Sequence, residues 1–268
     1  MTSGYLAAER VPERLRTVRV TRYVTPLREG GSLPAIVEAE DDGLYVLKFR
    51  GAGQGPKALV AELVVGEIGR TLGLRVPELV LAELDPLLAR SEPDPEIQAL
   101  IATSGGLNLA LDYLPGALNF EAGAPPLIAP MLASRILWFD AFAMNMDRTA
   151  RNPNMLIWHQ NLWLIDHGAA FYIHHSDADM RSRATQRFTP IRDHVLLPRA
   201  SELSAIDEEM AARLTADRLR HILSLVPDGW LVNEGESAEA RRADYVETFL
   251  ARLATPRLWL QEAIDARG

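Results

Sequence analysis

The chain has 268 residues, of which 48% are hydrophobic and 24% charged, a composition that fits a globular protein with room for two lobes. It contains no cysteine, which excludes disulfides, thiolate chemistry and cysteine-based zinc sites. The net charge of −8 argues against direct nucleic-acid binding, and no apolar run is long enough to cross a membrane. We therefore expect a cytoplasmic protein without a membrane partner.

The first part of the chain predicts a small lobe of antiparallel strands with one helix. A glycine-rich loop is followed by helical apolar spacing that ends near Gly73. Residues 85–100 contain three prolines and are predicted to be irregular. Alternating or short apolar runs between turns indicate strands and extended segments at 14–25, 36–40, 44–49, 75–84 and from Gly106 onward. Residues 1–116 are thus predicted to form the first lobe.

The second part, residues 117–268, is predicted to be mainly helical. A strongly apolar helix is expected within 126–145. Two short apolar strands with a turn at His159–Asn161 then predict a hairpin. A long irregular stretch runs from there to Ala200. The patterns predict the remaining helices at 207–226, at 237–252 and from about Pro256.

Polar residues flank this predicted hairpin in the segment "NMDRTARNPNMLIWHQNLWLIDHG". Asp147 and Asn152 precede the first strand, and Asp166 ends the second. Charges beside apolar strands are costly unless something pairs with them. A carboxylate can accept a hydroxyl proton, and carboxylate and amide oxygens are ligands for Mg²⁺. We therefore predict that Asp147 is catalytic and that Asn152 and Asp166 bind metal, with Asn154 as the alternative to Asn152.

Lysine is rare in this chain: of 28 basic residues only Lys48 and Lys57 are lysines. A compact ammonium differs from a guanidinium mainly where reach and point charge matter. Lys48 lies near the end of a predicted strand, where it could steady nucleotide phosphates opposite the metal. A glutamate in the following helix could hold this lysine by an ion pair. Glu62 is the first choice, and Glu67 is the alternative at a different angle on the same helix.

The order of these residues carries a resemblance. A lysine in a strand, a glutamate in the next helix, a D-x-x-x-x-N loop and a D-x-G after a hairpin follow the order of the protein-kinase-like fold. The segments "YVLKF", "AEL…IGRTLGLRVPE" and "NMDRTARNPNMLI…LWLIDHG" are similar to signatures of the HipA-like kinases, in particular short members that consist of the kinase core alone. The match covers roughly residues 30–175.

The resemblance implies an α+β, two-lobed, protein-kinase-like fold. It implies ATP and Mg²⁺ as cofactors and transfer of the γ-phosphate to a hydroxyl, which in HipA itself belongs to a protein serine. It also implies that "LALDYLPG" links the lobes, so that the backbone of Leu111, Asp112 and Tyr113 would pair with adenine. The phosphate loop would lie in "REGGSLPA", where Gly31 and Ser32 offer backbone N–H groups.

Other interpretations remain open at this point. A catalytically inactive nucleotide-binding scaffold could share the fold, and the enzyme could instead be a small-molecule kinase or a nucleotidyltransferase. The acceptor is not identified by any motif. For two neighbours of the predicted site we expect structural roles: Arg148 is predicted to pair with a nearby carboxylate, and His167 is predicted to pack against the helix of the first lobe.

Overall fold

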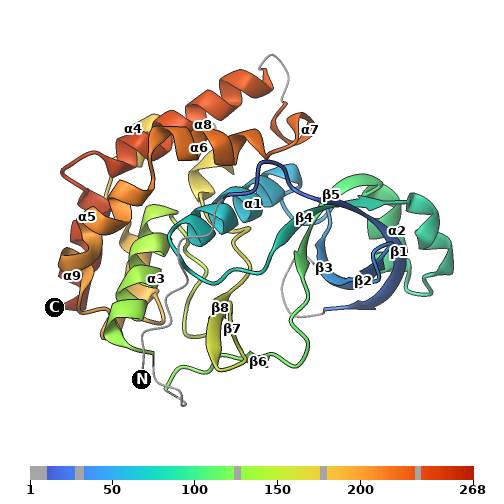
Figure 1. The fold of residues 1–268 in the computed structure, drawn as a ribbon, viewed down its shortest axis with the longest axis horizontal. Helices are drawn as coiled ribbons and strands as arrows, with labels where there is room; N and C mark the ends of the chain where they lie inside the picture. The colour runs from blue at the N-terminus through green and yellow to red at the C-terminus, as the bar shows by residue number, and fades with distance from the viewer. Residues whose placement is uncertain (1–10, 28–32, 124–127, 176–179, 233–236) are drawn as a thin grey trace.

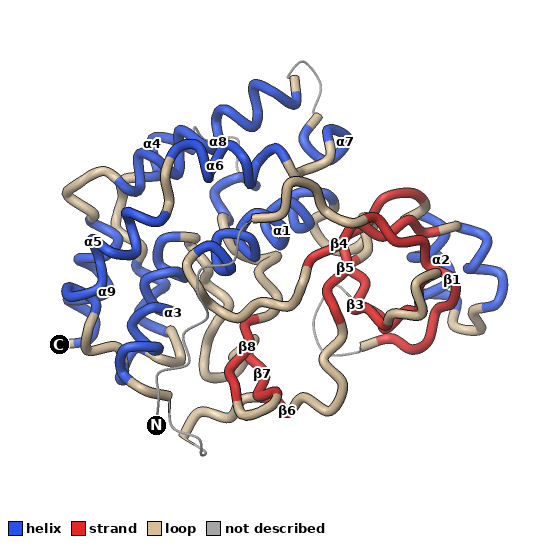
Figure 2. The backbone as a smooth tube through the Cα atoms, viewed as in Figure 1, coloured by secondary structure: helices blue, strands red, loops and turns tan. Residues whose placement is uncertain are grey.

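The structure is a computed structural model that describes residues 11–27, 33–123, 128–175, 180–232 and 237–268. A strand-rich part lies on one side of the molecule and a helical part on the other, with helix α1 (Pro56–Thr71) between them (Figure 1). Figure 2 shows that the strands gather in two places, a barrel and a small sheet near the middle of the molecule. The α+β content and the mainly helical second part agree with the sequence prediction.

The first five strands form a closed barrel rather than the predicted antiparallel sheet. The order around the barrel is β1-β2-β3-β5-β4, and β1 closes it by pairing with β4 in parallel, with Thr17 opposite Leu81. The other pairs are antiparallel, as predicted. The sequence could not show the closing pair, because period-2 alternation fixes a strand's faces but not its neighbours. The strands are Thr17–Pro26 (β1), Ala35–Ala39 (β2), Leu44–Lys48 (β3), Leu79–Leu84 (β4) and Gly106–Asp112 (β5).

The strand-rich part carries a second helix that the sequence prediction missed. The segment predicted to be irregular contains a 3₁₀ turn, η1 (Pro86–Ser91), and helix α2 (Pro95–Thr103). Each begins with proline after an aspartate whose side chain accepts a backbone N–H, from Leu87 for Asp85 and from Glu96 for Asp94. Asp at the N-cap followed by Pro is a helix-start signal, so the prolines mark starts here rather than breaks.

The predicted hairpin is confirmed. Strands β7 (Met155–Trp158) and β8 (Asn161–Leu164) pair antiparallel, and the short β6 (Leu118–Asn119) completes the sheet. His159 and Gln160 have φ values of 45° and 61°, as a two-residue type I′ turn requires. At the open end, Ile165 N–H donates to the carbonyl of Asn154 at 3.0 Å. The hairpin therefore delivers the residues before β7 and after β8 to the same place.

The helical part begins with α3 (Pro130–Phe142), the predicted apolar helix. The predicted helix at 207–226 is wrong as one element, because Thr215 starts a new helix by accepting the N–H of Arg218. The long stretch before Ala200 contains short helical turns: η2 (Tyr172–His175), α4 (Met180–Ala184), η3 (Thr189–Asp193) and η4 (Leu197–Arg199). The later helices are α5 (Leu203–Arg213), α6 (Ala216–Ser224), α7 (Asp228–Leu231), α8 (Ala238–Leu253) and α9 (Leu258–Arg267).

Two apolar cores hold the chain together. One fills the barrel and covers α2; the other joins α1 to the helices after residue 128. Helix α1 therefore precedes the predicted lobe boundary at 116 but shares a core with helices beyond that boundary, and the boundary stays a prediction. Within the larger core the buried guanidinium of Arg252 donates to the carbonyls of Ala141, Phe142 and Ala184, which ties α3 and α4 to α8. Among the described residues, no helix is both long and apolar enough to cross a membrane.

Candidate active site

Lys48 brings three elements together at the edge of the barrel. It is the last residue of β3, and its side chain is only 11% exposed. Its Nζ lies 2.7 Å from Asp166 Oδ1, just beyond β8, and 3.8 Å from Glu62 Oε2 on α1. The predicted lysine, helix glutamate and second aspartate are therefore in contact. Glu67, the alternative to Glu62, instead lies 3.6 Å from Arg70.

The charges of this group stabilise one another. Burial disfavours the ammonium of Lys48, but the negative charges of Glu62 and Asp166 outweigh burial and raise its pKa. The negative charge of Asp147 contributes to the same rise. Burial likewise disfavours the charged form of Glu62, yet Lys48 and His167 lower the pKa of that carboxyl. Both side chains are therefore charged at neutral pH.

His167 completes this group, which we call the lysine cluster: Lys48, Glu62, Asp166 and His167. The imidazole is fully buried, with Nδ1 at 3.4 Å from Glu62 Oε1 and its ring edge-on to Phe139 of α3. It thus packs against α1, as predicted. The contact between Nδ1 and Oε1 is an ion-pair distance that lacks hydrogen-bond geometry, and Nε2 has no hydrogen-bond partner within the part of the chain that the structure describes. Buried polar atoms are normally paired, so the cluster is incomplete.

Asp147 lies in the loop between α3 and β7, where both candidate asparagines reach it. Its Oδ2 accepts hydrogen bonds from Asn152 Nδ2 at 2.9 Å and from Asn154 Nδ2 at 3.2 Å. Its backbone N–H donates to Asn145 Oδ1 at 3.1 Å. Each asparagine amide that donates through nitrogen still has a carbonyl oxygen to offer a cation. The geometry therefore leaves the choice between Asn152 and Asn154 open.

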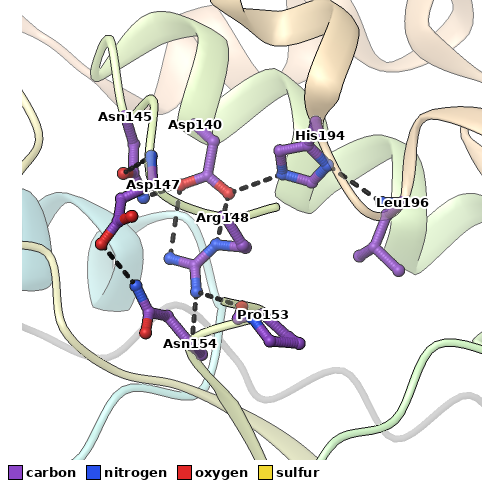
Figure 3. Close-up of polar contacts among 8 residues, drawn as sticks. All are labelled: Asp140, Asn145, Asp147, Arg148, Pro153, Asn154, His194 and Leu196. Carbon is purple, nitrogen blue, oxygen red and sulfur yellow. Dashed lines mark hydrogen bonds and ion pairs between the residues drawn. The ribbon is translucent and has the colours of Figure 1, made fainter. Parts of the chain in front are cut away.

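A second buried group lies beneath this loop, and we call it the arginine cluster: Asp140, Asn145, Arg148 and His194 (Figure 3). Arg148 follows Asp147 directly, has no exposed side-chain surface, and places Nε 2.6 Å from Asp140 Oδ2. The predicted pairing of Arg148 with a carboxylate is confirmed. Although burial disfavours its charged form, Arg148 and His194 lower the pKa of the Asp140 carboxyl.

Sequence reasoning assigned no role to Asp140 or His194. Asp140 did leave a signal, because it is a lone carboxylate in a helix whose other residues around it are apolar. His194 left none. It is 54 residues away from Asp140 in the chain, and only folding shows that its Nε2 lies 2.9 Å from Asp140 Oδ2.

The segment expected to contact adenine is built into the barrel. Leu111 is buried, and the backbone N–H groups of Asp112 and Tyr113 donate to the carbonyls of Glu78 and Leu44 at 2.9 and 3.0 Å. Those two donors are therefore already used within the chain, and adenine pairing at this segment stays a prediction. Burial, together with Glu78, raises the pKa of the Asp112 carboxyl. Gly31 and Ser32, predicted to form the phosphate loop, lie outside the described residues.

The donor set fits a magnesium ion held partly by a nucleotide. Among the described residues no group of three His, Cys, Asp or Glu could hold a metal by itself. Mg²⁺ usually takes one or two protein oxygens and fills its other positions with water and phosphate. Asp166 and an asparagine amide oxygen supply that number. Asp166 adopts φ 57°, an uncommon backbone conformation for a residue other than glycine, of the kind found at functional sites.

The chain is similar in fold to solved kinase structures. The crystal structure of the Helicobacter pylori proinflammatory kinase CtkA aligns with a TM-score of 0.54 at 12% identity, covering 93% of this chain and 99% of that one. The Golgi casein kinase with Mn/ADP bound gives a TM-score of 0.47 at 13% identity, covering 93% of this chain and 74% of that one. No curated protein sequence matches the chain. The likeness to CtkA shows that the two chains share a kinase fold.

A family model described as HipA-like kinase matches residues 20–262. That match covers well over half of the chain, including the lysine cluster, the Asp147 loop and most of the C-terminal helices. It confirms the resemblance inferred from the sequence motifs. The chain belongs to the HipA-like kinase family.

Proposed function

We propose that this chain is an ATP- and Mg²⁺-dependent kinase that transfers the γ-phosphate to a hydroxyl acceptor, a serine or threonine of a protein. One observation carries the proposal: Lys48 lies 2.7 Å from Asp166 and 3.8 Å from Glu62. The candidate base Asp147 is joined to the same end of the hairpin, because Asn154 holds its carboxylate and accepts the backbone N–H of Ile165 beside Asp166. These are the groups that phosphoryl transfer requires.

Lys48 is suited to hold phosphate. Its ammonium has three N–H donors. Among the described residues it makes two contacts, a short one to Asp166 and a longer ion pair to Glu62. A donor therefore remains for a phosphate oxygen. Glu62 keeps the ammonium charged and in place, because it is buried and anchored on α1.

Asp147 is suited to orient the acceptor hydroxyl and take its proton. Its Oδ2 is occupied by the amides of Asn152 and Asn154, while none of the described residues donates a hydrogen bond to Oδ1. Two fixed contacts on one oxygen orient the carboxylate and leave the other oxygen to accept. Asp166 and one of the two asparagines would hold magnesium, which when bound neutralises charge on the phosphates.

The choice of a protein hydroxyl as acceptor rests on family membership. The family is named for HipA, which acts on a protein serine, and the part of the chain that the structure describes adds no feature that selects a small molecule. A mass measurement separates the rival chemistries. A modified target that gains a phosphoryl group supports the kinase, whereas a gain of AMP would indicate nucleotidyl transfer instead.

The central test is Asp166→Ala. We expect Mg²⁺-dependent ATP turnover to fall by roughly 10³-fold, because a metal ligand and the short partner of Lys48 are both lost. Asp217→Ala is a matched control, since that aspartate is 95% exposed and contacts only Arg220 among the described side chains. Circular dichroism and urea unfolding should show both variants folded. Turnover by Asp166→Ala equal to that of the wild type would contradict the proposal.

A further inference from the structure

The loop that carries Asp147 is held in place by buried contacts that lead to His194, a residue far away in the chain. Arg148 closes the loop on itself: its Nη1 donates to the backbone carbonyls of Asn154 and Pro153, while Nε and Nη2 face Asp140. The loop that begins at Asp147 and ends at Asn154 is therefore spanned by one buried guanidinium. Any displacement of that guanidinium moves both ends of the loop.

Asp140 fixes the guanidinium, and it does so with both of its oxygens. Oδ1 accepts from Asn145 Nδ2 at 2.8 Å and from Arg148 Nη2 at 3.3 Å. Oδ2 accepts from Arg148 Nε at 2.6 Å and from His194 Nε2 at 2.9 Å. Asn145 in turn accepts the N–H of Asp147. Two separate routes thus lead from Asp140 to the candidate base, one through Arg148 and one through Asn145.

The tautomer of His194 follows from its two contacts. Leu196 N–H donates to His194 Nδ1 at 3.1 Å, so Nδ1 is an acceptor and carries no proton (Figure 3). The ring proton is then on Nε2, which donates to Asp140. The side chain is 2% exposed, and burial lowers its pKa despite the nearby carboxylate. The neutral Nε2–H form is therefore the one that fits at neutral pH.

The segment of His194 is also bound to the same loop through the backbone. Thr149 and His194 form an antiparallel bridge, and Val195 N–H donates to the carbonyl of Arg148 at 3.0 Å. This segment follows η3 and belongs to the stretch after Asp166. The stretch that follows the candidate metal ligand is therefore joined to the loop that carries the candidate base.

We propose that His194 is a positioning residue for catalysis: its Nε2–H holds Asp140, and through Arg148 and Asn145 fixes the Asp147 loop. The inference rests on the proposed kinase function. His194 itself contacts neither Asp147 nor the asparagines that bind it. If the Nε2–H is lost, a buried carboxylate oxygen loses one of its two donors, and Asp140 and Arg148 move to compensate. Displacements of about 1 Å at a reacting group can reduce turnover by roughly 10²-fold.

Two substitutions separate the hydrogen bond from the volume of the ring. His194→Leu keeps an apolar side chain in the buried site but removes the donor. His194→Gln keeps an N–H donor at about the reach of Nε2. His174→Leu is a matched control, because His174 is another fully buried histidine but places Nδ1 2.8 Å from the hydroxyl of Tyr245 on α8.

We expect His194→Leu to lower kcat for MgATP turnover by about 10- to 100-fold. The affinity for a fluorescent ATP analogue with Mg²⁺ should stay within about twofold of the wild type, since the lysine cluster is intact. His194→Gln and His174→Leu should keep kcat within about threefold. An unchanged kcat in His194→Leu, an equal loss in His194→Gln, or a parallel loss of analogue affinity would overturn the inference.

Nuclear magnetic resonance gives a readout that does not depend on turnover. The ring nitrogens of His194 should show the Nε2–H tautomer at pH 7. The side-chain amide signals of Asn152 and Asn154, which report their bonds to Asp147, should shift in His194→Leu but not in His194→Gln or His174→Leu. Unshifted signals in His194→Leu would overturn the inference. A wild-type protein without MgATP turnover would overturn the proposed function, while these signals would still decide the role of His194.

Discussion

The lysine cluster and the arginine cluster contain the same kinds of groups but differ in how many of their buried polar atoms form hydrogen bonds. Each has a buried carboxylate, a cation and a buried histidine. In the arginine cluster both oxygens of Asp140 accept two hydrogen bonds, and both nitrogens of His194 have partners. In the lysine cluster Glu62 Oε1 and His167 Nδ1 face each other at 3.4 Å without forming a hydrogen bond, and His167 Nε2 has no hydrogen-bond partner among the described residues.

This difference suits the arginine cluster to hold the Asp147 loop in place and the lysine cluster to bind a ligand. A complete network of buried polar groups is rigid, because any movement leaves a charge unpaired. The arginine cluster can therefore act as a fixed base for the Asp147 loop. The lysine cluster includes Asp166, whose side chain is 35% exposed, so it has access to solvent and to a ligand. The two clusters together place a rigid support beneath a group of charges that can still accept a phosphate.

The largest expected effect is on stability, in Asp140→Ala. Removing one partner of a buried ion pair leaves Arg148 uncompensated, which should lower the free energy of unfolding by about 3–5 kcal/mol. Asp166→Ala in the partly exposed lysine cluster should lower it by at most about 1 kcal/mol. Urea unfolding of both variants tests the contrast. Equal losses would show that the clusters do not differ in the way described.

A second prediction concerns activity and uses the two lysines of the chain. Lys48→Met should lower MgATP turnover by roughly 10²- to 10³-fold, because the donor that faces the phosphates is lost. Lys57→Met should leave turnover nearly unchanged, since Lys57 donates to the backbone carbonyl of His174 at 2.8 Å and forms no ion pair with the lysine cluster among the described residues. Steady-state ATP turnover decides the point, and similar losses in both variants would refute it.

A third prediction distinguishes the two glutamates of α1. Glu62→Gln keeps the size of the side chain but removes the charge beside Lys48, so turnover should fall about tenfold, or by about 1.4 kcal/mol. Glu67→Gln changes a buried glutamate on the same helix that faces Arg70 instead. It should have little effect on turnover. A larger loss in Glu67→Gln would reverse the assignment made from the structure.

The smallest expected effect is the pH dependence of stability. Burial lowers the pKa of His194 from its ordinary 6.5, so the unfolded chain binds this proton more readily, and stability should fall as pH drops below 6.5. The lowered pKa of Glu62 adds a further fall below about its ordinary 4.5. Unfolding midpoints at pH 7, 6 and 5 measure the first effect. The slope, at most about 1.4 kcal/mol per pH unit for one proton, should flatten in His194→Gln.

Local signals in the sequence predicted the parts of the site that lie close together in the chain. The hairpin and the positions of Asn152 and Asp166 at its open end follow from period-2 alternation and turn chemistry. The turn was predicted at His159–Asn161, and the structure places it at His159–Gln160. The order of motifs added Lys48 and Glu62. The sequence could not settle the choice between Glu62 and Glu67, because it depends on the angle at which α1 crosses the barrel.

The errors at η1, α2 and α6 have local causes, because each element has its own helix-start signal, whereas the closing β1–β4 pair of the barrel has none. Asp85 and Asp94 each precede a proline and start a helical turn, and Thr215 starts α6. Treating these prolines as breakers and Thr215 as a helix interior position gives the wrong elements. The contact between Asp140 and His194 is a different case. It joins residues 54 positions apart, and no property of either local segment could have indicated it.

Helix α1 has a consequence for how such an enzyme could be switched on and off. Twelve of its 16 residues are buried, and it packs on β4 and β5 on one side and on α6 and α7 on the other. Gly66 lies so close to Leu79 that an added Cβ would stand 2.7 Å from its Cδ1. An outward movement of α1, of the kind that breaks the Lys–Glu pair in many protein kinases, would expose the buried apolar side chains of this helix to water. For the proposed kinase we therefore expect the helix that holds Glu62 to stay in place rather than to act as a switch.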